Sequence, residues 1–154
     1  MNIFRDPVLL IAFGFGSGLS PKAPGTCGTL AAIPLYLLLQ ALGLIPYLAL
    51  VGLAGIAGVW ICSTASRKLG VHDHQGIVWD EIVGYWISMA GIPVSVQTLL
   101  AGFLLFRFFD ILKPWPIKTI DRSVEGGLGI MLDDVAAGVF ACLGLHALMR
   151  LGLL

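Results

Sequence analysis

Long apolar stretches separated by short polar segments dominate the chain. Residues 23–66 contain no Asp, Glu, Lys or Arg, and residues 82–106 form a second uncharged stretch. Because a membrane crossing needs ~20 apolar residues, the first stretch is long enough for two transmembrane helices. The pattern predicts helices over about residues 29–42 and 47–66, joined by a turn at residues 43–46. Pro34 is expected in the first turns of the former helix, where proline is tolerated.

Further helices are predicted along the rest of the chain, over about residues 7–15, 78–89, 96–112 and 132–151, and the last of these is long enough to span a membrane. Lys113-Pro114-Trp115-Pro116 ends the third of these, because each proline removes a backbone donor. The predicted fold class is therefore all-α, a multi-helical integral membrane protein built from short helical hairpins with the active-site loops on one face. Residues 1–154 are expected to form a single domain.

Composition excludes several classes of protein. Hydrophobic residues make up 58% of the 154 residues and charged residues only 12%, and a small water-soluble domain cannot hide that much apolar surface. The formal net charge of zero gives no basic face for nucleic acid, so no nucleic-acid partner is expected. The three cysteines are odd in number and widely spaced, which indicates neither a disulfide framework nor a zinc cluster.

The few charges are segregated along the sequence. Nine of the eighteen lie between Arg107 and Asp134, and five more lie between Arg67 and Glu81. If each uncharged stretch forms an out-and-back hairpin, the loops around Lys22, residue 73 and Lys118 emerge on one membrane face. An excess of Lys and Arg predicts that this face is cytoplasmic.

Five carboxylates adjoin the uncharged stretches and are the leading functional candidates, because ionisable groups beside hydrocarbon are costly. They are Asp80, Glu81, Asp110, Asp133 and Asp134. Their oxygen ligands suit Mg²⁺, and one or two ions fit the pattern. We expect all five to be metal ligands and Asp80, Glu81 and Asp134 to be catalytic. In the alternative reading, Asp133 and Asp134 only cap a helix, and Asp110 only pairs with Arg107 or Lys113 three residues away.

A loop rich in glycine and proline forms a second constellation. Ser20, Lys22, Thr26 and Thr29 supply hydroxyls and an ammonium group, and backbone N–H groups before a helix bind anions. These four residues are candidate substrate-binding residues, with a simple polar turn as the alternative. The spacing does not match a Walker A loop.

Cations and a histidine pair complete the candidate site. Arg107 and Lys113 flank the carboxylates and suit phosphate binding, although interfacial snorkelling toward lipid headgroups is the alternative. Asp73, within His72-Asp73-His74, is a candidate catalytic acid or base or a metal element, or else part of a solvated connector. Cys62 and Arg67 are one position too close for a Cys-x5-Arg loop, which favours a metal-activated water as the attacking group.

Four longer motifs stand out along the chain: GSGLSPKAPGTCGT at 16–29, HDHQGIVWDE at 72–81, FRFFDILKPWPIK at 106–118 and GGLGIMLDD at 126–134. Together they resemble the bacterial phosphatidylglycerophosphatase A family. The resemblance covers nearly the whole chain in order. It implies hydrolysis of phosphatidylglycerophosphate to phosphatidylglycerol and phosphate, with Mg²⁺, at the bacterial inner membrane, so the expected partners are a phospholipid substrate and the bilayer.

The alternative function is a cation-binding transporter or channel subunit, in which the same carboxylates bind a permeating ion. That function requires ionisable groups deep within spanning helices. The pattern instead predicts the carboxylates near helix ends, facing loops. The sequence therefore favours the enzyme.

Overall fold

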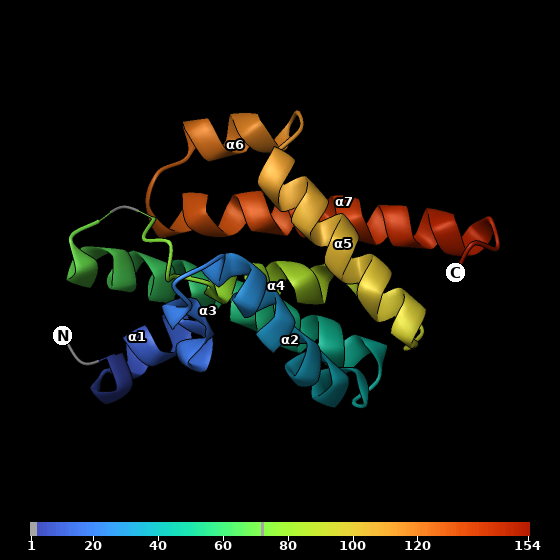
Figure 1. Ribbon diagram of the computed structural model, residues 1–154, viewed down its shortest axis with the longest axis horizontal. Coiled ribbons are helices and arrows are strands. Elements are labelled where there is room, and N and C mark those ends of the chain that lie inside the picture. Colours follow the sequence, from blue (N-terminus) through green and yellow to red (C-terminus); the bar gives the residue numbers. More distant parts are fainter. Residues whose placement is uncertain (1–2, 72) are drawn as a thin grey trace.

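The computed structural model describes residues 3–71 and 73–154, and all regular structure in these ranges is helical (Figure 1). This confirms the all-α prediction. The helices are α1 (Pro7–Ala12), α2 (Pro24–Gln40), α3 (Leu44–Leu69), α4 (Trp79–Ser88), α5 (Val96–Leu112), α6 (Ile117–Ser123) and α7 (Gly126–Arg150), with 3-10 turns η1 (Ile3–Arg5) and η2 (Gly14–Leu19).

The short helix α4 lies at the centre of the molecule. It packs most extensively against α7 and also against α2, α3 and α5. Its side chains are buried almost all round, from Ile82 through Trp86. A helix that is apolar on every side must be surrounded by other helices. The first turn of α4 is therefore held in place by the four helices around it.

The far end of α4 is fixed by hydrogen bonds from aromatic side chains. The Tyr47 hydroxyl donates to the carbonyl of Trp86 at 2.5 Å, and the Tyr36 hydroxyl donates to the carbonyl of Ile92 at 3.3 Å. The Trp86 indole N–H donates in turn to the carbonyl of Ala32. Carbonyls at a buried helix end need such donors because no water reaches them.

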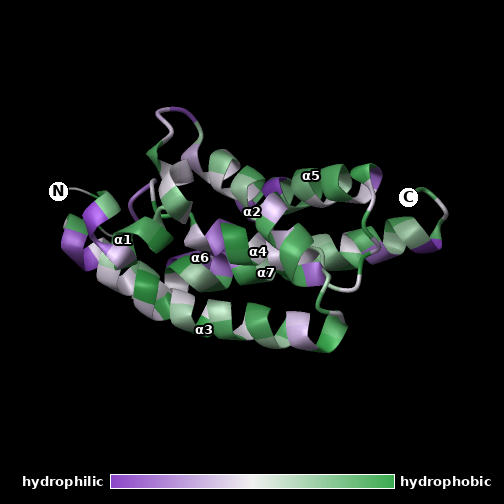
Figure 2. Ribbon diagram, turned by 90° about the horizontal axis from the view of Figure 1, so that it is seen from below, coloured by the Kyte–Doolittle hydropathy of each residue, from purple (hydrophilic) through white to green (hydrophobic). Residues whose placement is uncertain are grey.

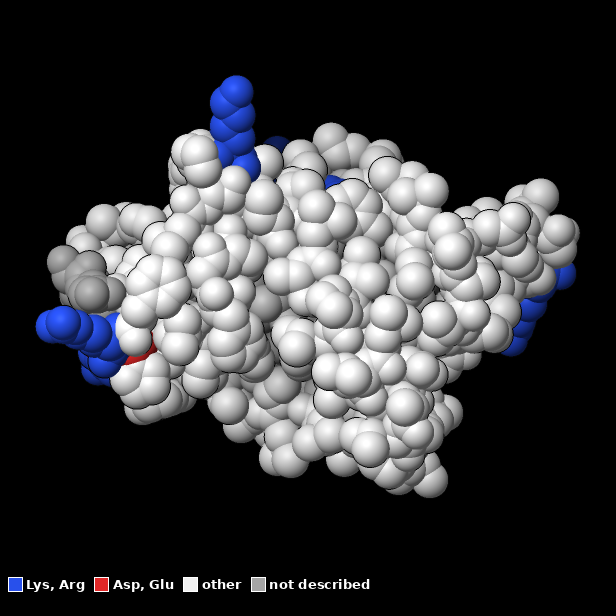
Figure 3. All heavy atoms as spheres, turned by 60° about the horizontal axis from the view of Figure 1, so that its bottom comes forward, with Lys and Arg blue, Asp and Glu red and all other residues white. Residues whose placement is uncertain are grey.

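Helices α3 and α7 are long and apolar enough to cross a membrane, with 26 and 25 residues. At 1.5 Å per residue each is ~38 Å long, more than the ~30 Å hydrocarbon thickness. Hydrophobic residues make up much of the α3 and α5 ribbons (Figure 2), and several of their large apolar side chains are exposed, such as Ile56 on α3 and Leu104 on α5. Figure 3 shows a face that is almost free of charge, with Lys and Arg confined to its edges. These features are those of a membrane protein.

Helix α2 begins five residues earlier than the sequence predicted. Pro24 is its first residue, where the missing N–H costs nothing. Thr26 and Thr29 consequently lie inside the helix rather than in a loop before it. Pro34 also stands in the middle of α2, so its expected position in the first turns was wrong.

Helix α7 differs most from the prediction. It begins at Gly126, so Asp133 and Asp134 stand about two turns inside it, and the reading in which they merely cap a helix is wrong. The first predicted helix ends at Ala12, three residues early, because the chain turns left-handed two residues later at Gly14 (φ 53°). Helix α6 lies in a segment for which no helix was predicted.

The connections between the helices lie at both ends of the bundle. In Figure 1 the C-terminal end of α3 and the connection 123–126 lie toward the left, whereas the turns at 41–43 and 89–95 and the C-terminus lie toward the right. The charged segments of the chain are therefore concentrated toward one end of the helices.

Candidate active site

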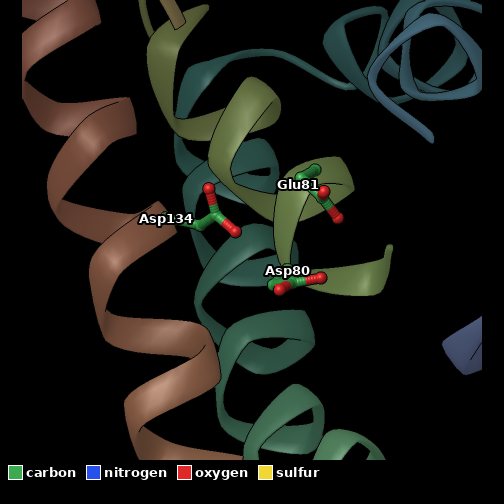
Figure 4. A group of neighbouring side chains, drawn as sticks. All are labelled: Asp80, Glu81 and Asp134. Atoms are coloured by element: carbon green, nitrogen blue, oxygen red, sulfur yellow. The ribbon is translucent and has the colours of Figure 1, made fainter. Parts of the chain in front are cut away.

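Three carboxylates from two helices converge at the first turn of α4. Asp80 and Glu81 lie in the first turn of α4, and Asp134 reaches them from α7 (Figure 4). One oxygen of each lies within 4.8 Å of the other two. This spacing allows a single cation to contact all three. We call Asp80, Glu81 and Asp134 the carboxylate triad.

The triad is buried and short of hydrogen-bond donors. Asp80 is 6% exposed and Asp134 is 3% exposed. Asp80 Oδ1, Glu81 Oε2 and Asp134 Oδ1 are buried without a hydrogen-bond partner among the described residues. Burying a carboxylate without a partner costs several kcal/mol per ion, by order of magnitude. Such oxygens fit a cation that is bound during function.

Burial also changes the acidity of the two α4 carboxyls. It raises the pKa of Asp80 well above its ordinary value, and the charges of Glu81 and Asp134 raise it further. Burial raises the pKa of Glu81 to about 7, although hydrogen bonding with Asp80 partly opposes this. Glu81 therefore exchanges its proton near neutral pH, where a general acid or base is most effective.

Arg107, on α5, is the cation closest to the triad. Its Nη1 donates to Asp110 Oδ2 at 2.5 Å and lies 3.8 Å from Glu81 Oε1. Its Nε is buried and has no partner among the described atoms. The pairing of Asp110 with Arg107 is the alternative that the sequence left open, so Asp110 holds the guanidinium in place. The free Nε–H remains available to an anion.

Lys113 links three parts of the site. Its ammonium group donates to Asp121 Oδ1 on α6 at 2.6 Å and to Asp133 Oδ2 on α7 at 2.5 Å. Burial alone would lower the pKa of Lys113, but its bonds to Asp121 and Asp133 outweigh burial and raise the pKa. The lysine is therefore charged. Asp133 and Asp110, both expected as metal ligands, each have one oxygen bound to a cationic side chain.

A cavity of about 260 Å³ connects these groups. Its lining contains eight of the residues singled out in the sequence, namely Asp73, Asp80, Glu81, Arg107, Asp110, Lys113, Asp133 and Asp134, together with Ala23, Pro24, Gly25, Gln75 and Ile77. Carboxylates and cations from three helices and two loops thus share one polar space. A phosphate group and a cation can occupy it together.

The sequence of this chain matches the family model for phosphatidylglycerophosphatase A over residues 10–149. The chain belongs to the phosphatidylglycerophosphatase A family. The resemblance expected from the four motifs is thereby confirmed, and the chain is a phosphatase, a phosphoric monoester hydrolase. The family match therefore decides between the enzyme and the transporter alternative.

Several relatives of the family align with most of the chain. A phosphatidylglycerophosphatase A from Escherichia coli is 49% identical over 88% of this chain and 80% of its own length. One from Haemophilus influenzae is 48% identical over 93% and 89% of the two chains. A Bacteroides thetaiotaomicron protein, named as a candidate phosphatidylinositol-3-phosphatase, is 42% identical over 86% and 87%. No solved structure matches the chain.

The loop predicted to bind phosphate does not bring its polar side chains to this phosphatidylglycerophosphatase A cavity. Ser20, Lys22, Thr26 and Thr29 are not among the described residues that line the cavity. The Ser20 hydroxyl donates to the Lys22 carbonyl, and the buried Thr29 hydroxyl donates to the Gly25 carbonyl at 2.9 Å. Their predicted contact with substrate therefore has no support in this geometry.

Gly25 is the residue of that loop which meets the triad. An added Cβ there would collide with Glu81 Oε1 and would lie 3.2 Å from Arg107 Nη1. Gly25 was part of the glycine-rich pattern, but its role is to make room for charged side chains. Gln75, Ala23 and Asp121 carried no signal in the sequence that set them apart.

Backbone strain is concentrated at the cavity. Among the described non-glycine residues, four have a left-handed backbone, and three of these line the cavity: Ala23 (φ 47°), Asp73 (φ 49°) and Lys113 (φ 43°). Such conformations cost of order 1 kcal/mol each and persist where the surrounding structure imposes them. Their clustering is typical of a functional site.

Of the two histidines beside Asp73, the structure describes only His74. His72 lies outside the described residues. His74 Nδ1 accepts a hydrogen bond from the Gly76 N–H at 3.0 Å, and its ring lies 5.6 Å from that of Phe13. His74 therefore shapes the loop that carries Asp73.

Proposed function

We propose that this chain hydrolyses phosphatidylglycerophosphate to phosphatidylglycerol and inorganic phosphate in phospholipid synthesis, with Mg²⁺ as cofactor. The observation that carries the proposal is the carboxylate triad. Its members have buried oxygens without hydrogen-bond partners among the described residues, and Arg107 and Lys113 line the same cavity. The printed names of the Escherichia coli and Haemophilus influenzae relatives support the substrate.

Asp80, Glu81 and Asp134 would hold Mg²⁺. Three carboxylates are a suitable protein contribution, because Mg²⁺ prefers oxygen ligands and completes its shell with water and substrate phosphate. When bound, the ion would supply charge neutralisation at the phosphoryl oxygens and lower the pKa of a water molecule. The unpartnered oxygens of the triad support this assignment.

Arg107 and Lys113 bind and orient the phosphate. The Arg107 Nε–H has no other buried acceptor among the described atoms, so a phosphoryl oxygen can take that bond. Lys113 has N–H capacity beyond its bonds to Asp121 and Asp133. Asp110 and Asp133 hold these two cations in position. Fixed cations of this kind stabilise charge that develops on the phosphoryl group.

The reaction itself requires one proton to move. A water molecule attacks phosphorus, its oxygen forms the new P–O bond, and the P–O bond to the glycerol oxygen breaks. Glu81 Oε2, buried and without a partner, accepts the proton of the water. The proton then passes to the leaving glycerol oxygen. A carboxylate with one oxygen facing the water can accept the proton in the first step and return it in the second.

The proposed location is the bacterial inner membrane, which the chain crosses several times with the cavity on the cytoplasmic face. Of the nine Lys and Arg residues, only Arg150 is at the C-terminal end of α7, opposite the loops. Positive charge favours the cytoplasmic side. The phosphate then leaves to the cytoplasm while the lipid product stays in the bilayer.

The test measures phosphate release from phosphatidylglycerophosphate in mixed micelles by the purified chain, with Mg²⁺ and with a chelator. Asp80→Asn and Asp134→Asn should each lose ~100-fold or more in rate. Glu125→Gln, an exposed acidic residue outside the cavity, is the matched control and should retain full rate. Unchanged hydrolysis in chelator would contradict the Mg²⁺ proposal. Faster hydrolysis of phosphatidylinositol 3-phosphate would contradict the proposed substrate.

A further inference from the structure

A second polar cavity, of about 140 Å³, adjoins the first one. Its lining comes from the loop before α4, from α6 and from the first turns of α7: Asp73, Asp80, Asp121, Val124, Gly129, Ile130 and Asp133. Asp73, Asp80 and Asp133 line both cavities. Four carboxylates thus face this small space, and its described lining contains no cationic residue.

Two of these carboxylates are buried and have oxygens to spare. Asp80 is 6% exposed and Asp133 is 8% exposed. The Oδ1 atom of each is buried without a hydrogen-bond partner among the described residues. Lys113 contacts Asp133 through the other oxygen, Oδ2, and lines only the first cavity. The ion pair with Lys113 therefore does not satisfy Asp133.

The charges of the two cavities are unbalanced. Together their described linings contain seven carboxylates but only two cations, Arg107 and Lys113. One divalent ion at the triad would offset only part of this excess. Unpaired charge in a poorly solvated place is costly, and cavities of this kind favour further cations.

We propose that the second cavity binds a second divalent cation, of the Mg²⁺ class, with Asp80 shared between the two ions. Asp133 and Asp121 are its other principal ligands, and Asp73 lies at the junction of the cavities. This inference rests on the proposed function at the triad. It gives Asp121, a residue of α6, a part in metal binding.

The size of the cavity suits a partly hydrated ion. The triad is the only described group of three carboxylates with ligand oxygens all within 4.8 Å, so the oxygens of the second cavity are further apart. A water occupies ~30 Å³, so 140 Å³ holds an ion with several waters. Mg²⁺ commonly keeps several waters and contacts only one or two carboxylates directly.

The experiment counts Mn²⁺, as a paramagnetic probe, on the purified full chain in detergent without substrate. Equilibrium dialysis should give two ions per wild-type chain, and electron paramagnetic resonance should show spin coupling between neighbouring ions. Asp121→Asn should bind one ion, with the uncoupled spectrum of a single Mn²⁺. Glu125→Gln, four residues away and exposed, should retain two coupled ions.

Asp121 has 40% of its side chain exposed, so the substitution leaves the core intact, and circular dichroism checks folding. The wild-type count decides the matter without any variant. One ion on the wild type, or two coupled ions on Asp121→Asn, overturns the second site and leaves the proposed function standing. Failure to bind any Mn²⁺ overturns both.

Discussion

Gly84 lies directly against the backbone of Asp134. A Cβ added to Gly84 would stand 2.9 Å from the Asp134 carbonyl oxygen and 2.6 Å from Phe106 Cε2. On the opposite side of this contact, a Cβ at Gly138 would collide with the Gly84 carbonyl. Because neither glycine has a side chain, α4 and α7 can lie close together. This close approach sets the distance between Asp134 on α7 and the two carboxylates on α4.

Gly84→Ala should therefore push α4 from α7 and weaken metal binding. We expect destabilisation of about 1–3 kcal/mol from overpacking and a loss of at least ~10-fold in Mn²⁺ affinity, measured by thermal unfolding and by dialysis. Gly52→Ala, on α3, is the matched control, since no described atom lies within 4 Å of its added Cβ. Equal behaviour of the two variants would show that the helix contact does not set the site.

Arg107→Met should impair substrate handling more than metal binding. The variant removes the guanidinium beside Glu81 and Asp110, so we expect a fall of ~100-fold or more in kcat/KM. The Mn²⁺ count per chain should stay unchanged, because Arg107 contributes no metal ligand. Lys118→Met, an exposed cation outside the cavities, should keep the wild-type kcat/KM. Loss of Mn²⁺ from Arg107→Met would place the guanidinium in the structural support of the triad instead.

Stability without metal should depend on pH through Glu81. Its folded pKa of about 7 lies above the ordinary value of 4.5, so the folded state binds more protons between these pH values. This contribution is fully present below pH 4.5 and is lost as pH rises to about 7. The Tm of chelator-treated protein should therefore fall over that range, and Mg²⁺ should restore it at pH 8. Glu81→Gln should reduce the slope without abolishing it, because the raised pKa of Asp80 contributes in the same direction. An unchanged slope in this variant would assign the effect to groups other than Glu81.

The loop before α2 should respond to substitution at Gly25 and not at Thr29. Gly25→Ala places a methyl group against Glu81 Oε1, and we expect a loss of ~10-fold or more in phosphate release. Thr29→Val removes a hydroxyl that donates only to the Gly25 carbonyl, so activity should stay within about twofold and stability should fall by ~1 kcal/mol. A large loss of activity in Thr29→Val would restore the phosphate-binding role first expected for that residue.

The sequence predicts the helices well where apolar residues run without interruption. Helix α5 has the predicted bounds, Val96–Leu112, and α4 differs by one residue at each end. The start of α7 was missed because Gly126, Gly127 and Gly129 are typical of a loop. Gly127 is glycine for another reason, since a Cβ there would collide with the Val59 carbonyl of α3. Such a contact between distant segments is not visible in local sequence.

The carboxylate cluster could be predicted in composition but not in arrangement. Charged residues beside apolar helices indicated Asp80, Glu81 and Asp134, which the structure brings together. The structure is needed to tell which carboxylates pair with cationic side chains. This pairing depends on the placement of α6 and on the left-handed backbone at Lys113, whose ammonium group contacts both Asp121 and Asp133. These relationships join residues 8 and 20 positions apart and follow from tertiary packing.

The ten residues of α4 span only ~15 Å, about half of a bilayer core. Tyr47 binds the far end of this helix, and its first turn carries Asp80 and Glu81. In the proposed reaction, a lipid would keep its chains in the leaflet while its terminal phosphate enters the cavity. The lipid product would then stay in the plane of the membrane, and the phosphate would leave into water.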